Sequence, residues 1–415
     1  MSKSILINSI ILSFGILIGR LSGYIREIVI ASQYGATEQS DTILLMLTVP
    51  DLLNNLLASG AIVGILIPLL TTHPSQIEEV LTEFTKKLFL ISLVFYIGLT
   101  AIIFFIYDFY LFGLLAISLL SVFPNIYTFI ISGYLQFEKR FKKQSLNTLI
   151  FNIVIILFLF IEGNNIIFSF AVVIASLIRL LWIYSDLRYT NISIKSLLKS
   201  KSNHLLDYKI LSFMIIANGL MFINPMIDKI FSSFLVDGSV AILSYAEKIY
   251  LLPVSVFLTT YAVAMFPDLS KLVSDNNVKE VHKILKKSIS LNIIVSLIVG
   301  FILYLFSYEI VSLFFNIANL QEDVLFSISL VLNGYLVALC IAGTNSILLN
   351  LIFSHKWYES LIIYSLFIVS TKILLNILVL NFELGIEYIA YGTSFVGILS
   401  IIYLSILYIK KVKKV

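Results

Sequence analysis

Long runs of apolar residues, separated by short polar stretches, dominate the chain. Most are at least as long as the ~20 residues that a helix needs to cross the hydrocarbon core of a bilayer. They lack two-residue alternation and far exceed the ~10 residues of a barrel strand. The pattern therefore predicts an all-α polytopic membrane protein with twelve transmembrane helices. The predicted segments are residues 5–32, 41–70, 86–106, 109–135, 146–162, 165–185, 210–235, 240–266, 288–306, 325–353, 358–380 and 385–409.

Lysine and arginine residues outside these segments all fall on one side of the predicted membrane. The turns on the other side hold none, and they lie near Gly35, Asp108, Asn164, Gly238, Asn319 and Phe382. Cytoplasmic loops carry the excess of Lys and Arg, so both termini are predicted to be cytoplasmic. The apolar run from Ile5 continues past Arg20 without a cleavage pattern, and we expect a membrane helix there rather than a removable signal.

Composition supports the membrane assignment and excludes several classes of protein. Hydrophobic residues make up 59% of the 415 residues and charged residues 13%, against about 25% charged in soluble domains. No HExxH, GxSxG or GxxxxGK[ST] motif is present, and all four histidines fall in predicted cytoplasmic loops. A net charge of +4 gives no indication of nucleic-acid binding. We expect a transporter rather than an enzyme, without a cofactor or metal, driven by the membrane potential or a monovalent cation.

A few cations lie inside the predicted helices, where charge is costly and usually faces a cavity or a partner. Apart from Lys86 and Lys87 at the cytoplasmic start of segment 86–106, they are Arg20, Arg26, Arg179, Lys229, Lys248 and Lys372. Arg179 lies about two turns from the cytoplasmic end of its helix and is expected to extend toward it. Arg20 and Arg26 lie deeper and predict a cavity role, with structural pairing as the alternative. The same two interpretations stay open for Lys248 and Lys229, and buried pairing is the simpler one for Lys372.

A short internal sequence repeat relates the two halves of the chain. GYIREIVIASQYGA, followed by Pro50 and Pro68, resembles NPMIDKIFSSFLVDG, followed by Pro253 and Pro267. Six segments separate the copies, so they run in the same direction and predict two six-helix lobes related by a parallel pseudo-two-fold repeat. The predicted domains are an N-terminal lobe over 1–186, a cytoplasmic linker over 187–209 and a C-terminal lobe over 210–415.

The intramembrane cations favour an anionic substrate. Arg20, Arg26 and Lys248 lie on helices that the repeat relates, and arginine makes bidentate contacts with phosphate. A diphosphate would suit such a group. Polar residues on the same helices could bond a sugar or peptide headgroup, or could bond neighbouring helices.

Two pairs of helices carry a resemblance to a known family. GRLSGYIREIVIASQYGATEQSD with VPDLLNNLLASGAIVGILIPLL, and INPMIDKIFSSFLVDGSVAILSYAEKIYLLP with FPDLSKLVSDNN, resemble the MurJ (MviN) lipid II flippases. The match continues more loosely through SHKWYES to the C-terminus. The resemblance implies a two-lobed, alternating-access transporter in the bacterial inner membrane. It would move an undecaprenyl-diphosphate-linked precursor to the outer leaflet, with cell-envelope synthesis proteins as partners.

The resemblance also implies roles for particular residues. The family's essential cavity arginines fall on Arg20 and Arg26, and its following acid falls on Glu27. An acid at the start of the next helix falls on Asp41. A third cavity arginine falls on Lys248, which keeps the charge but lacks the bidentate fork.

The chain departs from the family pattern at several points. An arginine pair of the family is here Asn54 and Asn55, and an acid is here Ser59. We expect these three residues to line the headgroup cavity. The family usually has fourteen helices, the last two forming a lipid groove, and twelve are predicted here. These departures admit a different lipid-linked glycan.

Some family members hold a sodium ion between their seventh and eleventh helices, and the matching positions are Asp228, Lys372 and Asn376. Lys372 and Asn376 are four residues apart and share a helix face. We hypothesise that the Lys372 ammonium replaces the ion by pairing with Asp228.

Three classes of function stay open. The first is a flippase for lipid II or for another lipid-linked oligosaccharide, such as an O-antigen, capsule or exopolysaccharide unit. The second is a multidrug-type exporter, which would need an acid-dominated cavity for cationic drugs. The third is a non-transporting scaffold for envelope assembly. The intramembrane cations favour the first.

Overall fold

Helices form all the regular structure in the part of the chain that the computed structural model describes. This part comprises residues 3–61, 65–73, 75–138, 140–161, 164–187, 211, 223–275, 277–355 and 357–412. The chain divides into two compact units, which we call unit 1 (Met1–Gln33 and Thr42–Met226) and unit 2 (Tyr34–Asp41 and Ile227–Val415). The predicted lobe boundaries stay predictions, because 188–210 and 212–222 lie outside the described residues.

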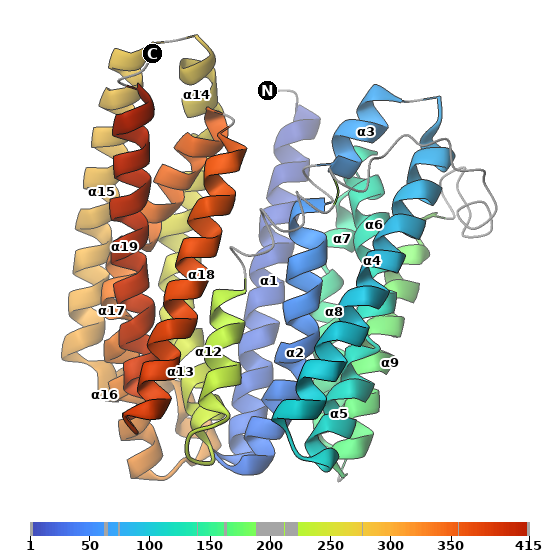
Figure 1. The fold of residues 1–415 in the computed structure, drawn as a ribbon, viewed down its shortest axis with the longest axis vertical. Coiled ribbons are helices and arrows are strands. Elements are labelled where there is room, and N and C mark those ends of the chain that lie inside the picture. The colour runs from blue at the N-terminus through green and yellow to red at the C-terminus, as the bar shows by residue number, and fades with distance from the viewer. Residues whose placement is uncertain are drawn as a thin grey trace. The chain divides into compact units, whose positions relative to one another are not determined.

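Unit 1 contains most of α1 and the helices that follow it as far as the predicted linker (Figure 1). Its helices are α1 (Lys3–Tyr34), α2 (Glu38–Ala61), α3 (Ile67–Thr72), α4 (Ile77–Ile106), α5 (Phe109–Leu119), α6 (Val122–Phe137), α7 (Lys142–Ser145), α8 (Asn147–Leu159) and α9 (Asn165–Tyr184). Two of the expected turns have clear chemical causes. Asp108 caps α5 by accepting from the Tyr110 and Leu111 amides, and Asn164 caps α9 by accepting from the Ile166 amide, so each satisfies orphan donors at a helix start.

Unit 2 contains the second set of long helices. Its helices are α12 (Asn224–Ser232, with its first turn in unit 1), α13 (Ser239–Pro253), α14 (Thr259–Ser274), α15 (Val278–Leu305), α16 (Ser307–Phe315), α17 (Glu322–Ser354), α18 (Tyr358–Asn381) and α19 (Glu387–Val412). A π-helical stretch over Val254–Leu258 joins α13 to α14 directly after Pro253. Proline lacks the backbone donor and clashes with the preceding turn, which explains the change of helical register there.

Eight helices in the described part of the chain are long and apolar enough to cross a membrane. They correspond to the predicted segments 86–106, 109–135, 165–185, 240–266, 288–306, 325–353, 358–380 and 385–409. The protein is therefore an all-helical membrane protein, and the count of twelve stays a prediction. Among the other four segments, α8 has only 13 residues, α2 ends at Ala61 before 62–64, which lie outside the described residues, and most of 210–235 also lies outside them.

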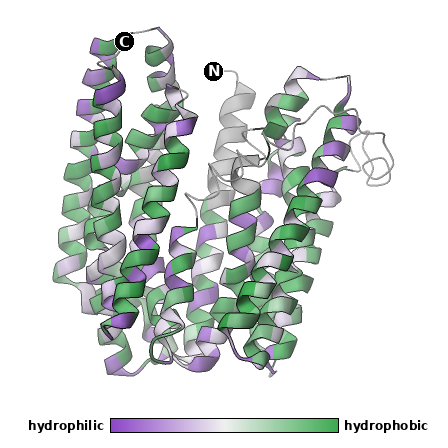
Figure 2. Ribbon diagram, in the orientation of Figure 1, coloured by the Kyte–Doolittle hydropathy of each residue, from purple (hydrophilic) through white to green (hydrophobic). Residues whose placement is uncertain are grey.

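The outer surfaces of the long helices are apolar, as a lipid-facing protein requires. Figure 2 shows hydrophobic positions along the lengths of the helices and hydrophilic ones concentrated toward several of their ends. On α4, only 11% of the most apolar window is buried within the protein, and Phe105 is 85% exposed. Because lipid tails are as apolar as these side chains, close packing and hydrogen bonds must hold the helices together.

The packing of α17 against α19 illustrates this requirement in unit 2. At Gly334 of α17, an added Cβ would lie 2.8 Å from the Ala390 Cβ and 3.0 Å from the Glu387 carbonyl oxygen, so only glycine allows this approach. The Ser394 hydroxyl donates to the Gly334 carbonyl at 2.6 Å and accepts from the Ala338 amide at 3.0 Å. Small residues and hydroxyl hydrogen bonds thus join the two helices.

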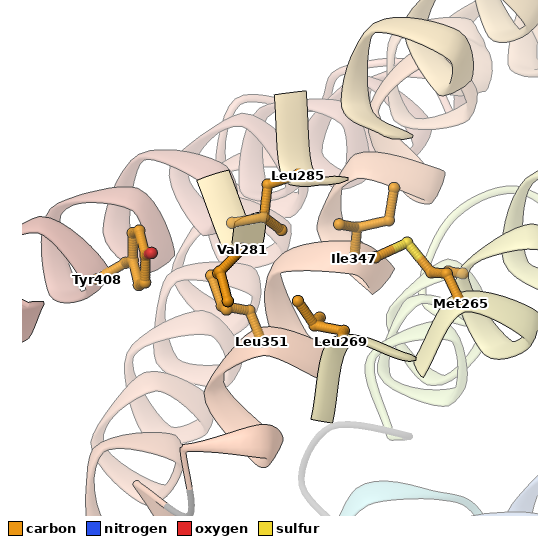
Figure 3. Packing of buried hydrophobic residues seen from close by; sticks show 8 residues of the cluster. Met265, Leu269, Val281, Leu285, Ile347, Leu351 and Tyr408 are labelled. Atoms are coloured by element: carbon orange, nitrogen blue, oxygen red, sulfur yellow. The ribbon is translucent and has the colours of Figure 1, made fainter. Parts of the chain in front are cut away.

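An apolar cluster joins four helices of unit 2. Figure 3 shows Met265 and Leu269 of α14 lying against side chains of α15 and α17, with Tyr408 of α19 at the edge of the group. Its members are Ala262, Met265, Leu269, Val281, Leu285, Ile347, Leu351 and Tyr408. The cluster holds α14, α15, α17 and α19 in fixed positions beside the residues that join α17 to α18.

Candidate functional site

A stripe of glycines on α1 brings Arg26 close to α8. An added Cβ at Gly15 would overlap Ser145 of α7, directly before α8, and one at Gly19 would lie 3.1 Å from the Thr148 Cβ of α8. Glycines four residues apart let two helix backbones approach closely in a membrane. This close contact explains how a short side chain on α8 reaches the charged face of α1.

Asn152 of α8 holds Arg26 in place. Its Oδ1 accepts from Arg26 Nη1 at 3.0 Å, while its Nδ2 donates to the Ser22 hydroxyl at 2.9 Å. Arg26 Nη2 lies 3.0 Å from Glu27 Oε1, and Glu27 is almost fully buried. The Arg26 side chain is 12% exposed, and its buried Nε has no hydrogen-bond partner among the described residues. The protein thus fixes Nη1 and Nη2 of Arg26, while the Nε–H donor is left for an acceptor from another molecule.

The remaining predicted site residues of unit 1 are arranged differently. Arg20 is exposed, and no contact in the described residues joins it to Arg26. On α2, Asn54 is 5% exposed, and its Oδ1 has no hydrogen-bond partner in the part of the chain that the structure describes. Asn55 Nδ2 lies 3.8 Å from the Met226 sulfur. The side chain of Ser59 lies outside the described residues.

Asp41 caps a helix of unit 2. Its Oδ2 accepts from the Gly238 amide and its Oδ1 from the Ala241 amide, both at 2.8 Å, so the carboxylate lies at the N-terminus of α13. Anionic groups are favoured there by the helix dipole and the orphan amides. Gly238 has a φ of +87°, and a Cβ there would lie 2.4 Å from the Ala36 carbonyl oxygen. A substrate headgroup would have to compete with α13 for this carboxylate.

The two lysines near α13 have different surroundings. Lys229 of α12 pairs with Glu247 of α13 at 2.8 Å, and both side chains are largely buried. This pair joins α12 to α13 and gives Lys229 a structural partner. Lys248, the next residue along α13, is half-buried.

Asp228, Lys372 and Asn376 meet inside unit 2, in the pairing that we hypothesised from the sequence. Lys372 Nζ lies 2.9 Å from Asp228 Oδ1, and Asn376 Nδ2 donates to the same oxygen at 2.8 Å. Lys372 also donates to the Ile389 carbonyl and the Thr393 hydroxyl. All three ammonium hydrogens therefore have acceptors, although Lys372 is 0% exposed.

The family model described as "Lipid II flippase MurJ" matches residues 30–415. The chain belongs to the MurJ lipid II flippase family. Among curated relatives, the probable lipid II flippase MurJ of Rickettsia prowazekii is 24% identical over 336 residues, which cover 74% of this chain and 65% of that protein. The corresponding protein of Aquifex aeolicus is 26% identical over 383 residues, covering 85% and 72% of the two chains. The chain thus spans about two thirds of the length of the first relative.

Solved structures show the same fold. Lipid II flippase MurJ in an inward closed conformation matches with a TM-score of 0.81 and 22% identity, covering 97% of this chain and 87% of that one. An inward-facing multidrug resistance MATE family transporter of the MOP superfamily matches with a TM-score of 0.75 and 16% identity, covering 95% and 96% of the two chains. Membership of the MurJ family makes the chain a multi-pass membrane protein.

The expected extension of Arg179 of α9 toward the cytoplasmic end stays a prediction. Its guanidinium carbon lies 5.4 Å from the ring centres of both Phe129 and Phe151, and its Nε and Nη2 are buried. Aromatic rings from α6 and α8 attract the guanidinium, and their position cannot be read from α9 alone.

Several contacts of the candidate site were missed from the sequence. Asn152, Glu247 and Thr393 each complete a charged group, and each comes from a different helix than the charge it contacts. Glu83 and Lys87 of α4 carry a local signal, because they lie four residues apart and form a buried pair. In the described residues, no group of three or more metal-ligating side chains is present.

Proposed function

We propose that the chain moves an undecaprenyl-diphosphate-linked cell-envelope precursor, lipid II of peptidoglycan, from the cytoplasmic to the outer leaflet. The observation that carries the proposal is the fixed Arg26 guanidinium, held by Asn152 and Glu27 with its Nε unpartnered, in a chain of the MurJ family. Such a group suits a phosphate, because arginine binds it bidentately and keeps its charge.

The proposed architecture extends this account. Twelve transmembrane helices form two six-helix lobes over 1–186 and 210–415, related by a parallel repeat, with a cytoplasmic linker over 187–209. The lobes expose the binding cavity alternately to the two sides of the bacterial inner membrane, and both termini are cytoplasmic. Lipid bilayer and a polyprenyl-diphosphate-linked glycan are the partners, together with cell-envelope synthesis proteins. The membrane potential is the driving force that fits a fixed cationic site.

Each site residue has a proposed part in this cycle. Arg20, Arg26 and Lys248 contact the diphosphate, and Glu27 orients Arg26. Asn54, Asn55 and Ser59 bond the headgroup, which the unpartnered Oδ1 of Asn54 supports. Asp41 acts through α13, whose N-terminus it caps.

We also propose that Lys372 fills the position of a coupling cation. The ammonium is held by Asp228 Oδ1, the Ile389 carbonyl and Thr393, and Asn376 supports the same carboxylate. Oxygen ligands arranged around a single positive charge are what a sodium ion would need. Transport is then expected to proceed equally in sodium and in potassium buffers. A sodium-dependent rate that Asp228→Asn abolishes would contradict this part of the proposal.

A flippase for another lipid-linked oligosaccharide is the second candidate. Asn54 and Asn55 favour it, because uncharged amides at the headgroup would suit a neutral glycan as well as a peptide-bearing one. A multidrug-type exporter is less well supported, because Arg20, Arg26 and Lys248 would repel cationic drugs.

Complementation tests the choice between these functions. Cells depleted of their own MurJ would receive the wild-type chain, Arg26→Ala, or the control Lys283→Ala, whose side chain is 75% exposed. We expect growth with wild type and with the control, and lysis with Arg26→Ala. No rescue by a wild-type chain that reaches the membrane, with loss of surface polysaccharide on deletion in the native host, would favour the second candidate.

A further inference from the structure

Arg179 is a buried cation of unit 1 that the proposed site does not use. It lies on α9 between two aromatic neighbours, Phe129 of α6 and Phe151 of α8, each 5.4 Å from ring centre to guanidinium carbon. A cation near ring faces is attracted by the ring quadrupole and loses freedom to move. The two phenyl rings therefore fix the position of the guanidinium.

The edge of this guanidinium lacks acceptors. Its Nε and Nη2 are buried without hydrogen-bond partners in the described part of the chain. The N–H bonds of these two nitrogens point along one edge of the planar group, which is the fork that receives two oxygens of a carboxylate or phosphate. Unpartnered donors are costly within a membrane, so this edge is arranged for an acceptor that is an anion.

The acidic residue whose charge acts on Arg179 does not form an ion pair with its unpartnered edge. Asp51 of α2 is the acidic residue whose charge acts on Arg179, but no ion pair joins the two. Asp51 is exposed and follows Pro50 directly, on the same turn of α2 as the buried Asn54. The fork therefore lies near the part of α2 that carries the proposed headgroup residues.

Arg179 of α9 and Arg26 of α1 contact neighbouring residues of α8. Phe151, which contacts Arg179, and Asn152, which holds Arg26, are consecutive residues. Consecutive residues in a helix differ in height by about 1.5 Å and point in directions about 100° apart. The α8 residues that contact the two guanidinium groups are thus adjacent along the helix and lie on neighbouring faces of it.

We propose that Arg179 is a second phosphate-binding residue, which contacts the diphosphate of the substrate together with Arg26. This inference rests on the proposed function and adds one residue to its site. Two arginines that contact adjacent residues of α8 give the site a preference for a diphosphate over a monophosphate, because each can bind the oxygens of one phosphoryl group. The phenyl rings of Phe129 and Phe151 position the fork.

Binding of short polyprenyl probes to the purified full chain in nanodiscs tests the inference. Farnesyl diphosphate and farnesyl monophosphate are titrated against wild type, Arg179→Gln, Arg179→Lys, Asp51→Asn and the exposed control Lys283→Gln. We expect the preference for the diphosphate to fall about tenfold in Arg179→Gln. This is the change in affinity that the loss of one charged hydrogen-bonded contact produces. Arg179→Lys, which keeps the charge without the fork, lowers it as well, while Asp51→Asn and the control retain it.

The outcomes separate this inference from the proposed function. The inference is overturned if Arg179→Gln keeps the wild-type preference for the diphosphate. If Arg179→Gln fails to fold, the same result in Arg179→Lys overturns it. So does an equal loss in Asp51→Asn, because Arg179 would then serve only to balance that carboxylate. Arg26→Gln provides the comparison: if it weakens diphosphate binding while Arg179 variants do not, the function stands without the second arginine. If neither wild type nor any variant prefers the diphosphate, the proposed function fails too.

Discussion

The Lys372 ammonium lies 2.9 Å from Asp228 Oδ1 in the interior of unit 2, where neither side chain meets solvent. Removing water from two opposite charges is expensive, and their attraction compensates only when every donor and acceptor is used. Thr393 meets this condition, because it accepts from Lys372 and donates to Asp228 Oδ2 at 2.9 Å. The pair therefore joins α12 to α18 and α19 as long as both charges are present.

Lys372→Met is expected to destabilise the protein strongly, by about 3–5 kcal/mol, because it leaves the Asp228 carboxylate buried and unpaired. The double variant Lys372→Met with Asp228→Leu removes both charges and is expected to regain most of the loss. Thermal unfolding in detergent measures both. A single variant as stable as wild type would show that the pair does not hold these helices together.

Asn152→Ala is expected to impair function by freeing Arg26. The change removes the acceptor of Arg26 Nη1 and the donor to Ser22, and losing such bonds costs about 1–3 kcal/mol. Complementation should fall toward the level of Arg26→Ala, while the chain still reaches the membrane. Asn147→Ala, which alters another buried asparagine of α8, is the matched control. Full activity of Asn152→Ala would show that Arg26 needs no support from α8.

Asp41→Ala is expected to lower stability by about 0.5–2 kcal/mol, since it removes the cap from the N-terminus of α13. Asp41→Asn and Asp41→Ser keep an acceptor oxygen and should recover part of the loss. The melting temperature in detergent gives the order of the three variants. If Asp41→Ala kept wild-type stability but lost all activity, the carboxylate would act on the substrate rather than on α13.

Gly334→Leu is expected to disrupt the contact of α17 with α19. Even a Cβ would lie 2.8 Å from Ala390, and overpacking a tight contact costs about 1–3 kcal/mol or more. Gly98→Leu is the control, because no atom lies within 4 Å of an added Cβ there. The amount of folded protein that elutes as a single species measures the effect. Equal yields of both variants would contradict the assigned packing.

Stability is expected to fall in mild acid through His355, which follows α17 outside the membrane. Burial lowers the pKa of the His355 imidazole, which stacks on Trp357 with ring centres 4.3 Å apart. The unfolded chain therefore binds its proton first as the pH falls below about 6.5. The contribution of the neutral imidazole is complete above that pH and is lost as the pH falls toward the lowered pKa. His355→Gln should show a smaller loss of melting temperature between pH 7.5 and 5.5, and an unchanged loss would contradict this account.

The sequence allowed prediction of those features that depend on local pattern. Apolar length identified the eight long spans, and the four-residue spacing of Lys372 and Asn376 placed both on one helix face. Their link to Asp228 came from the family resemblance. Roles that depend on a distant partner were missed. Asp41 meets Gly238 across 197 residues, and Asn152 meets Arg26 across 126. Asparagine in an apolar helix does not reveal which helix it will contact, and Arg179 does not reveal the rings that hold it.

Transport of lipid II in proteoliposomes tests the central claim most directly. The purified chain would be reconstituted with fluorescent lipid II, and the fraction accessible to an external reagent would be followed after a membrane potential is applied. We expect wild type and Lys283→Ala to move the lipid at equal rates in sodium and potassium buffers, and Arg26→Ala to show only the background rate. Movement by Arg26→Ala at the wild-type rate, or none by a folded wild-type chain, would contradict the account.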